Sequence, residues 1–162
     1  MARFKLPESV LVVIHTPQLD VLLLERADFP GFWQSVTGSR ATPEEPLDAT
    51  CAREVAEETG LVQPPSAFDD WNYAHRYPIY PQWRHRYAQG VTHNQEHLFG
   101  LRVAARFAPR LAPDEHSRWQ WLNWRDAADV CFSWTNSMAI RLLAHRAVRG
   151  HGGGADADRG PP

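Results

Sequence analysis

The chain has 162 residues, enough for one domain with a sizeable core and too few for two. Its formal net charge of −2 gives no general attraction to nucleic acid or to a membrane surface. The longest apolar runs, Val10–Ile14 and Val21–Leu24, are far too short to span a bilayer, and the N-terminus lacks the apolar stretch of a signal peptide. Cys51 and Cys131 have no metal-binding or redox spacing, so we expect a reducing, cytoplasmic setting.

Segments with the pattern of β-strands recur along the chain. The first two lie near the N-terminus and are joined by a turn at 17–20. Strands are expected at 9–14, 21–25, 32–36, 70–75, 96–103 and 119–124. A last helix is expected over 135–148. Mixed strands with helices on both sides indicate an α/β sandwich. We expect a single domain over residues 1–149, followed by a disordered Gly/Pro-rich tail over 150–162.

A helix in the first half of the chain carries the most informative residues. It is expected to begin at Pro46, a residue suited to the first helical position, and to end at Gly60, which suits the position after the last turn. Along it Leu47, Cys51 and Val55 recur every fourth residue and predict an apolar stripe packed against the sheet.

Three carboxylates share one side of this helix. Glu54, Glu57 and Glu58 stand at positions i, i+3 and i+4, so they fall within an arc of roughly 100°. They repel one another and sit in the last turn, where the helix dipole disfavours negative charge. A solvated acidic face is the simpler interpretation of such a triplet. A bound divalent cation would instead make the spacing favourable, and oxygen ligands alone point to magnesium.

The surrounding residues resemble the Nudix hydrolase signature, G-x5-E-x7-R-E-U-x-E-E-x-G-U. From Glu45 onward the match is letter for letter, through Arg53, Glu54, Glu57, Glu58 and Gly60, with Val55 and Leu61 in the apolar positions. Six residues, not five, separate Gly38 from Glu45. We place the extra residue in the 39–44 loop, because a loop tolerates an insertion and a helix register does not.

The resemblance implies the Nudix fold, an α/β/α sandwich with a mixed sheet, and metal-dependent hydrolysis of a diphosphate. By position it implies Glu54 and Glu58 as direct Mg²⁺ ligands, with Mn²⁺ left open. Glu57 lies adjacent, either as a ligand or behind the ligands. Arg53 would orient Glu45 or a neighbouring carboxylate, although the pair could also be a plain surface ion pair.

Family members commonly add one carboxylate from outside the signature. Glu115 and Glu96 are the candidates. We favour Glu115, which precedes the strand at 119–124 in a loop able to lean over the metal site. Glu96 opens an apolar strand, where we expect its side chain to point outward. Either residue could also be a solvated loop acid.

Beyond the signature, residues from Lys5 to Ile140 resemble the bacterial dihydroneopterin triphosphate pyrophosphohydrolases of folate biosynthesis. The similarity rests on the stretches FWQSVTGS, RHRYAQGVTHN and SWTNS. It implies hydrolysis to dihydroneopterin monophosphate and pyrophosphate. An aromatic segment from Tyr73 to Tyr87, interleaved with Arg76, Arg84 and Arg86, could sandwich a flat ring and meet phosphates, or simply pack on the sheet. The expected substrate contacts are Lys5, Arg26, Thr37, Tyr77, Tyr80 and Ser133.

Three other functions compete with this interpretation. A purine resembles a pterin in outline, so a nucleoside triphosphate pyrophosphohydrolase that removes damaged nucleotides is the main alternative. An enzyme acting on 5′-triphosphate RNA is disfavoured by the acidic balance. A non-catalytic binding protein is disfavoured because such a domain need not keep the carboxylates. The expected partner is therefore a small-molecule triphosphate, not nucleic acid or a membrane.

Overall fold

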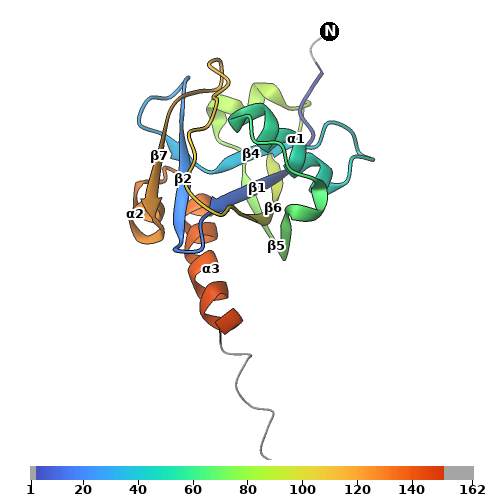
Figure 1. Ribbon diagram of the computed structural model, residues 1–162. Helices are drawn as coiled ribbons and strands as arrows, with labels where there is room; N and C mark the ends of the chain where they lie inside the picture. The colour runs from blue at the N-terminus through green and yellow to red at the C-terminus, as the bar shows by residue number, and fades with distance from the viewer. Residues whose placement is uncertain (1–2, 152–162) are drawn as a thin grey trace, which may run out of the picture.

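The structure, a computed structural model, describes residues 3–151 and has three layers (Figure 1). A mixed seven-stranded sheet forms the middle layer. Helix α1 (Leu47–Thr59) packs on one face, and α2 (Trp124–Val130) and α3 (Trp134–His151) pack on the other. The predicted α/β/α sandwich with a mixed sheet is therefore confirmed.

Strand β1 (Glu8–His15) lies at the centre of the sheet. It runs parallel to β6 (His93–Arg102) and antiparallel to β4 (Val36–Ser39). The next strand in sequence, β2 (Asp20–Arg26), meets β1 at the single pair His15 and Val21 among the described residues. The remaining ladders join β2 to β3 (Trp33–Gln34) and β7 (His116–Asn123), and β6 to β5 (Asp69–Pro78). The start of β1, the end of β4 and the start of β6 therefore lie side by side.

The alternation of side chains along β1 builds two separate cores. Val10, Val12 and Ile14 face α1, where Cys51 and Val55 complete the predicted apolar stripe. Leu11 and Val13 face the opposite side, where they pack with residues of α2 and α3. A strand buried on both faces reads as the continuous apolar run seen in the sequence.

Helix α1 ends as the sequence predicts and begins one residue later. Gly60 adopts a left-handed conformation with φ of 74° and caps the last turn, since its N–H donates to the carbonyl of Ala56. Pro46 has ψ of 148°, so it is the extended N-cap residue, and Leu47 takes the first helical position. The prediction of Pro46 as the first helical residue was wrong by one position.

Three short elements escape the sequence analysis: α2 and the 3₁₀ turns η1 (Pro65–Ala67) and η2 (Pro81–Arg86). Asn123 marks the start of α2, because its side chain accepts hydrogen bonds from the backbone N–H groups of Arg125 and Asp126. Helix α3 continues through His151, so the first two residues of the predicted tail are helical. The rest of that tail, 152–162, lies outside the described residues.

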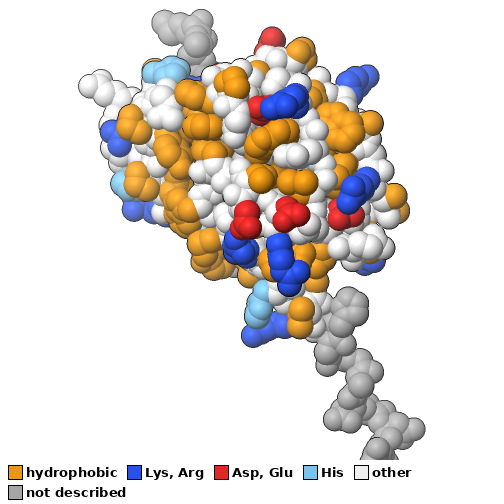
Figure 2. All heavy atoms as spheres, turned by 90° about the vertical axis from the view of Figure 1, so that its left-hand side faces the viewer, with side chains coloured by type: hydrophobic (Ala, Val, Ile, Leu, Met, Phe, Trp, Pro, Cys, Tyr) orange, Lys and Arg blue, Asp and Glu red, His pale blue; other side chains and the backbone are white. Residues whose placement is uncertain are grey.

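The surface over β7 and α2 is mixed in character. Figure 2 shows hydrophobic side chains there interspersed with charges of both signs. Within residues 3–151, each helix is too short or too polar to traverse a lipid bilayer.

Candidate active site

Arg53 connects the acidic helix to the loop before it. Its guanidinium donates to both carboxylate oxygens of Glu45, at 2.8 and 3.1 Å. It also donates to Glu54 at 2.6 Å and to the carbonyl of Ser39 at 2.9 Å. These bonds from Arg53 lower the pKa of Glu45 to about 2, so Glu45 is ionised at neutral pH. Arg53 thus pairs with Glu45 as predicted, and the pair is more than a surface ion pair.

The extra residue between Gly38 and Glu45 is taken up by a loop that Arg40 fastens. Arg40 donates to the Glu45 carbonyl at 2.8 Å, to Glu8 at 2.5 Å and to the Pro43 carbonyl. The N–H of Ala41 donates to the Glu45 carboxylate at 2.5 Å. The loop therefore keeps Glu45 against Arg53, and the register of the helix is unaffected.

Gly38 is required because Glu54 lies directly against it. A Cβ added at Gly38 would lie 1.9 Å from Cδ of Glu54. The two residues belong to β4 and α1, so the missing side chain lets the carboxylate reach the edge of the sheet. Burial raises the pKa of Glu54 to about 7, against the opposing effect of Arg53.

Glu58 is the most buried of the three helix carboxylates, with 2% of the residue exposed. Its Oε2 has no hydrogen-bond partner among the described residues. Burial, then the charges of Glu54 and Glu115, raise its pKa well above the usual value. Glu57 differs, because its side chain is 53% exposed and lies 3.5 Å from Arg53.

The last residue of the loop before β7 and the first residue of β7 bring further ligand atoms to Glu58. Glu58, Glu115 and His116 offer atoms that all lie within 4.8 Å of one another. Burial lowers the pKa of His116 to about 4, so its imidazole is neutral, and Nδ1 is unpaired. An unpaired buried oxygen inside a group of carboxylates fits a hard divalent cation, which would neutralise their repulsion. Of the two candidate extra carboxylates, Glu115 is the one beside Glu58.

Two basic residues face this acidic group. The backbone N–H of Lys5 donates to the carbonyl of Arg86 at 2.8 Å, which ties the N-terminal segment to η2. Arg26 donates to both oxygens of Asp28 at 2.8 Å and lies 4.5 Å above the ring of Trp83. The charges of Lys5 and Arg26 both oppose the rise in the pKa of Glu58, so both lie within electrostatic reach of it.

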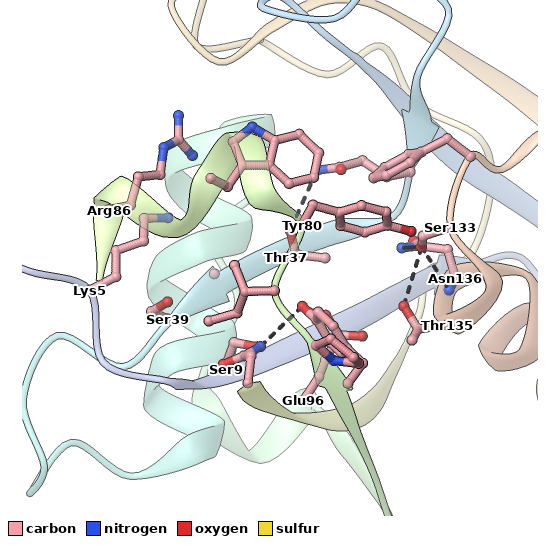
Figure 3. Close-up of a pocket in the computed structure, with 18 of the residues that line it drawn as sticks. Lys5, Ser9, Thr37, Ser39, Tyr80, Arg86, Glu96, Ser133, Thr135 and Asn136 are labelled. Atoms are coloured by element: carbon pink, nitrogen blue, oxygen red, sulfur yellow. Dashed lines mark hydrogen bonds between the residues drawn. The ribbon is translucent and has the colours of Figure 1, made fainter. Parts of the chain in front are cut away.

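All six predicted substrate contacts line a single pocket: Lys5, Arg26, Thr37, Tyr77, Tyr80 and Ser133. Gly38 also lines it, so the pocket opens beside Glu54. Figure 3 shows Lys5 and Arg86 at one end and Ser133 and Thr135 at the other. The arrangement offers positive charge at the end near the carboxylates and neutral polar groups at the far end.

The aromatic segment contributes only part of its length. Tyr77, Tyr80, Trp83 and Tyr87 line the pocket, and Tyr80 and Trp83 pack edge to face at 5.4 Å. Tyr73 does not line it; it is half exposed and packs on His75. Of the three arginines in the segment, Arg86 alone is part of the lining.

Several pocket residues were not predicted as substrate contacts from the sequence: Ser9, Asn94, Thr135 and Asn136. The prediction that the side chain of Glu96 points outward was wrong. Glu96 is 3% exposed and lines the pocket on the same sheet face as Leu98. The available signal was the alternation of Asn94, Glu96 and Leu98, which places polar residues on a face that continues into the core.

Comparison with known proteins identifies the family of this chain. The chain matches the NUDIX domain over residues 5–142. It is 38% identical to the dihydroneopterin triphosphate diphosphatase of Haemophilus influenzae over 144 residues, covering 87% of this chain and 89% of that protein. Identity to the Escherichia coli K12 protein of the same name is 39% over 148 residues, covering 90% and 97%.

Solved structures give the same result. The E. coli dihydroneopterin triphosphate pyrophosphohydrolase superposes with a TM-score of 0.81 at 36% identity, covering 88% of this chain and 98% of that one. A Listeria monocytogenes NUDIX hydrolase shares the fold, with a TM-score of 0.73 at 21% identity, covering 90% and 97%. The chain therefore belongs to the NUDIX family of diphosphate-bond hydrolases.

Proposed function

We propose that this protein hydrolyses dihydroneopterin triphosphate to dihydroneopterin monophosphate and pyrophosphate, as a step of folate biosynthesis. One observation carries the proposal: a single pocket extends from Gly38, which lies against Glu54 of the acidic helix, past Lys5, to a polar and aromatic end at Ser133. Such a pocket suits a molecule with a triphosphate at one end and a flat, hydrogen-bonding ring at the other. The choice of a pterin as that ring follows from the relatives described above, which are named dihydroneopterin triphosphate diphosphatases.

The carboxylates are proposed to hold Mg²⁺, with Mn²⁺ as an alternative. Glu58 and Glu115, which offer oxygens within 4.8 Å of each other, would be direct ligands together with Glu54, one turn earlier on α1. Glu57, whose side chain is 53% exposed, would assist. When bound, the ion neutralises phosphate charge and lowers the pKa of a coordinated water. Arg53 holds Glu54 and Glu45 in fixed positions, which is an orienting role.

The basic residues are proposed to bind the phosphates. Lys5 lines the pocket beside the carboxylates and would neutralise non-bridging oxygens. Arg26 is held by Asp28 on one side and by the face of Trp83 on the other, so its guanidinium is already ordered before substrate binds. That order lowers the conformational entropy lost on binding.

The far end is proposed to bind the ring and its hydroxylated side chain. Tyr80 and Trp83 provide aromatic surface. Thr37 and Ser133 offer hydroxyl groups, and the oxygen of Ser133 is fixed by Asn136, whose Nδ2 donates to it at 2.8 Å. The reducing cytoplasm remains the proposed setting, supported by Cys51 and Cys131, which are both free thiols.

The test is a turnover panel with Mg²⁺ at mildly alkaline pH. Dihydroneopterin triphosphate, each dNTP and 5′-triphosphate RNA would be compared by kcat/KM, with pyrophosphate and orthophosphate resolved. Glu58→Gln should abolish turnover, whereas Glu44→Gln, the same change on an exposed loop side chain, should not. Faster turnover of a nucleotide would refute dihydroneopterin triphosphate as the substrate but leave the hydrolysis of a diphosphate bond standing. No turnover of any compound would favour a binding role.

A further inference from the structure

Two buried acceptor atoms in the pocket lining have no hydrogen-bond donor. Asn94 and Glu96 lie on β6 and are buried, with exposed fractions of 2% and 3%, respectively. Oδ1 of Asn94 and Oε1 of Glu96 have no partner among the described residues. Native proteins pair about 90% or more of such groups, because an unpaired buried acceptor gives up its hydrogen bonds to water without a replacement. Two unpaired acceptors together in one pocket point to a ligand that brings donors.

The surrounding hydrogen bonds fix the orientation of Asn94. The hydroxyl of Tyr77 is directed to Oε2 of Glu96 at 3.5 Å, so its oxygen acts as an acceptor toward Asn94. Nδ2 of Asn94 therefore donates to Tyr77 at 3.1 Å and to Ser9 at 2.7 Å. The amide oxygen is left for another donor.

The sheet register sets Glu96 in a polar row just beyond the core. On the face shared with α3, Ser39, Ser9, Glu96 and His75 lie side by side across four strands. The next row inward on β1 and β6 is Leu11 and Leu98, both fully buried beneath α2 and α3. Figure 3 shows Glu96 on the side of Thr135 and Ser133, away from Lys5. Glu96 therefore belongs to the ring end of the pocket, not to the phosphate end.

A carboxylate pairs best with two parallel N–H donors. The 2-amino-4-oxo edge of a pterin offers this pair, since the exocyclic amine and the adjacent ring N–H point the same way. Adenine and cytosine place an acceptor nitrogen beside their amine, so they repel a carboxylate. Guanine carries the same edge as the pterin, and a lumazine, with oxygen in place of the 2-amino group, lacks it.

We propose that Glu96, assisted by Asn94, binds the 2-amino-4-oxo edge of the ring and selects the ring class that this enzyme accepts. The choice of a pterin as the ligand rests on the proposed function. Recognition of the 2-amino-4-oxo edge does not, because guanine carries the same edge. Burial raises the pKa of Glu96 to about 7, opposed by the hydroxyls of Thr135 and Tyr77. Two ring donors would favour the ionised form further.

Binding without phosphates tests Glu96 independently of catalysis. The affinity of neopterin and of the corresponding lumazine would be measured by fluorescence titration for wild type, Glu96→Gln and Glu44→Gln. Wild type and Glu44→Gln should prefer neopterin by about 10- to 100-fold, the value of hydrogen bonds to a charged group. Glu96→Gln should lose most of this preference, because an amide presents one acceptor and one donor. Thermal unfolding would confirm that the variant is folded.

The same preference retained in folded Glu96→Gln would overturn the proposal and leave the proposed function standing. If the variant does not fold, wild type decides alone: equal affinity for neopterin and the lumazine refutes the role of Glu96. If wild type turns over dGTP faster than dihydroneopterin triphosphate, the proposed function fails. The proposal then stands if dGTP is preferred over dITP, which lacks the 2-amino group, and falls if the two are equal.

Discussion

Gly38→Ala should remove activity while leaving the fold nearly intact. The added Cβ would lie 1.9 Å from Cδ of Glu54, against the 3.4 Å of ordinary van der Waals contact. Cδ must therefore move by about 1.5 Å, and misplacement by about 1 Å of a group that positions the reaction can cost 10²-fold. We expect kcat/KM for dihydroneopterin triphosphate to fall by at least about 100-fold.

The cost in stability should be small because the atoms that clash are the end of a flexible side chain. Overpacking costs about 1–3 kcal/mol, and the lower value applies where one side chain can swing away. Gly90→Ala is the matched control. It has φ of 86° with open space around the added Cβ, so it should lose about 1–2 kcal/mol and keep its activity.

Urea unfolding and steady-state kinetics on the same preparations separate the two effects. Gly38→Ala should lose activity at a stability cost of about 1 kcal/mol, whereas Gly90→Ala should lose about 1–2 kcal/mol and keep its activity. If Gly38→Ala kept kcat/KM within about threefold of wild type, Glu54 would not need its observed position. The assignment of Glu54 to the metal would then be refuted.

Three further experiments follow from individual contacts. Glu45→Gln should destabilise the fold by about 1–3 kcal/mol at pH 7. In the folded protein the pKa of Glu45 is lowered from 4.5 to about 2. The difference in free energy of unfolding between wild type and Glu45→Gln should therefore be fully present above pH 4.5 and disappear as the pH falls toward 2. A difference that does not change with pH would refute the role of the Glu45 carboxylate. Asn136→Ala should cost about 1–3 kcal/mol in urea, since it leaves the N–H of Ser35 buried without its acceptor at 2.8 Å; a loss below about 0.5 kcal/mol would contradict this. Mg²⁺ at 100 times its Kd should stabilise wild type by about 2.7 kcal/mol in thermal unfolding. Glu115→Gln should reduce that shift, and an unchanged shift would exclude Glu115 as a ligand.

The acidic half of the site was predictable because its geometry is local. Spacing within one helix places Glu54 and Glu58 on the same side, whatever the rest of the fold does. Arg53 reaches Glu45 because Glu45 lies just before the helix and Arg53 stands about two turns along it. The extra residue before Glu45 could be assigned to the loop for the same reason, since a helix fixes its own register and a loop does not.

The ring end was less accessible to sequence reasoning because it depends on strand pairing. Ser9 lies beside Glu96 only through the parallel register of β1 with β6, and those strands are far apart in the chain. The prediction that Glu96 points outward treated a charged residue in an apolar strand as solvent-facing. The register places it instead on the face shared with Leu98, which is buried.

The location of Glu96 explains why a rule that works elsewhere in the sheet fails there. The side chain of Leu98 points to the core, where α3 covers it. Glu96 lies on the same face at the point where α3 begins, since α3 starts at Trp134 and Thr135 in its first turn lies beside Glu96. The face is therefore still closed to water at Glu96, although no apolar layer fills it. A charged residue on a buried face stays only if something compensates its burial. The hydroxyls of Thr135 and Tyr77 compensate part of that burial, and the unpaired Oε1 leaves a position for a donor from a ligand, so a buried charge at this point in the sequence fits the proposed ring site.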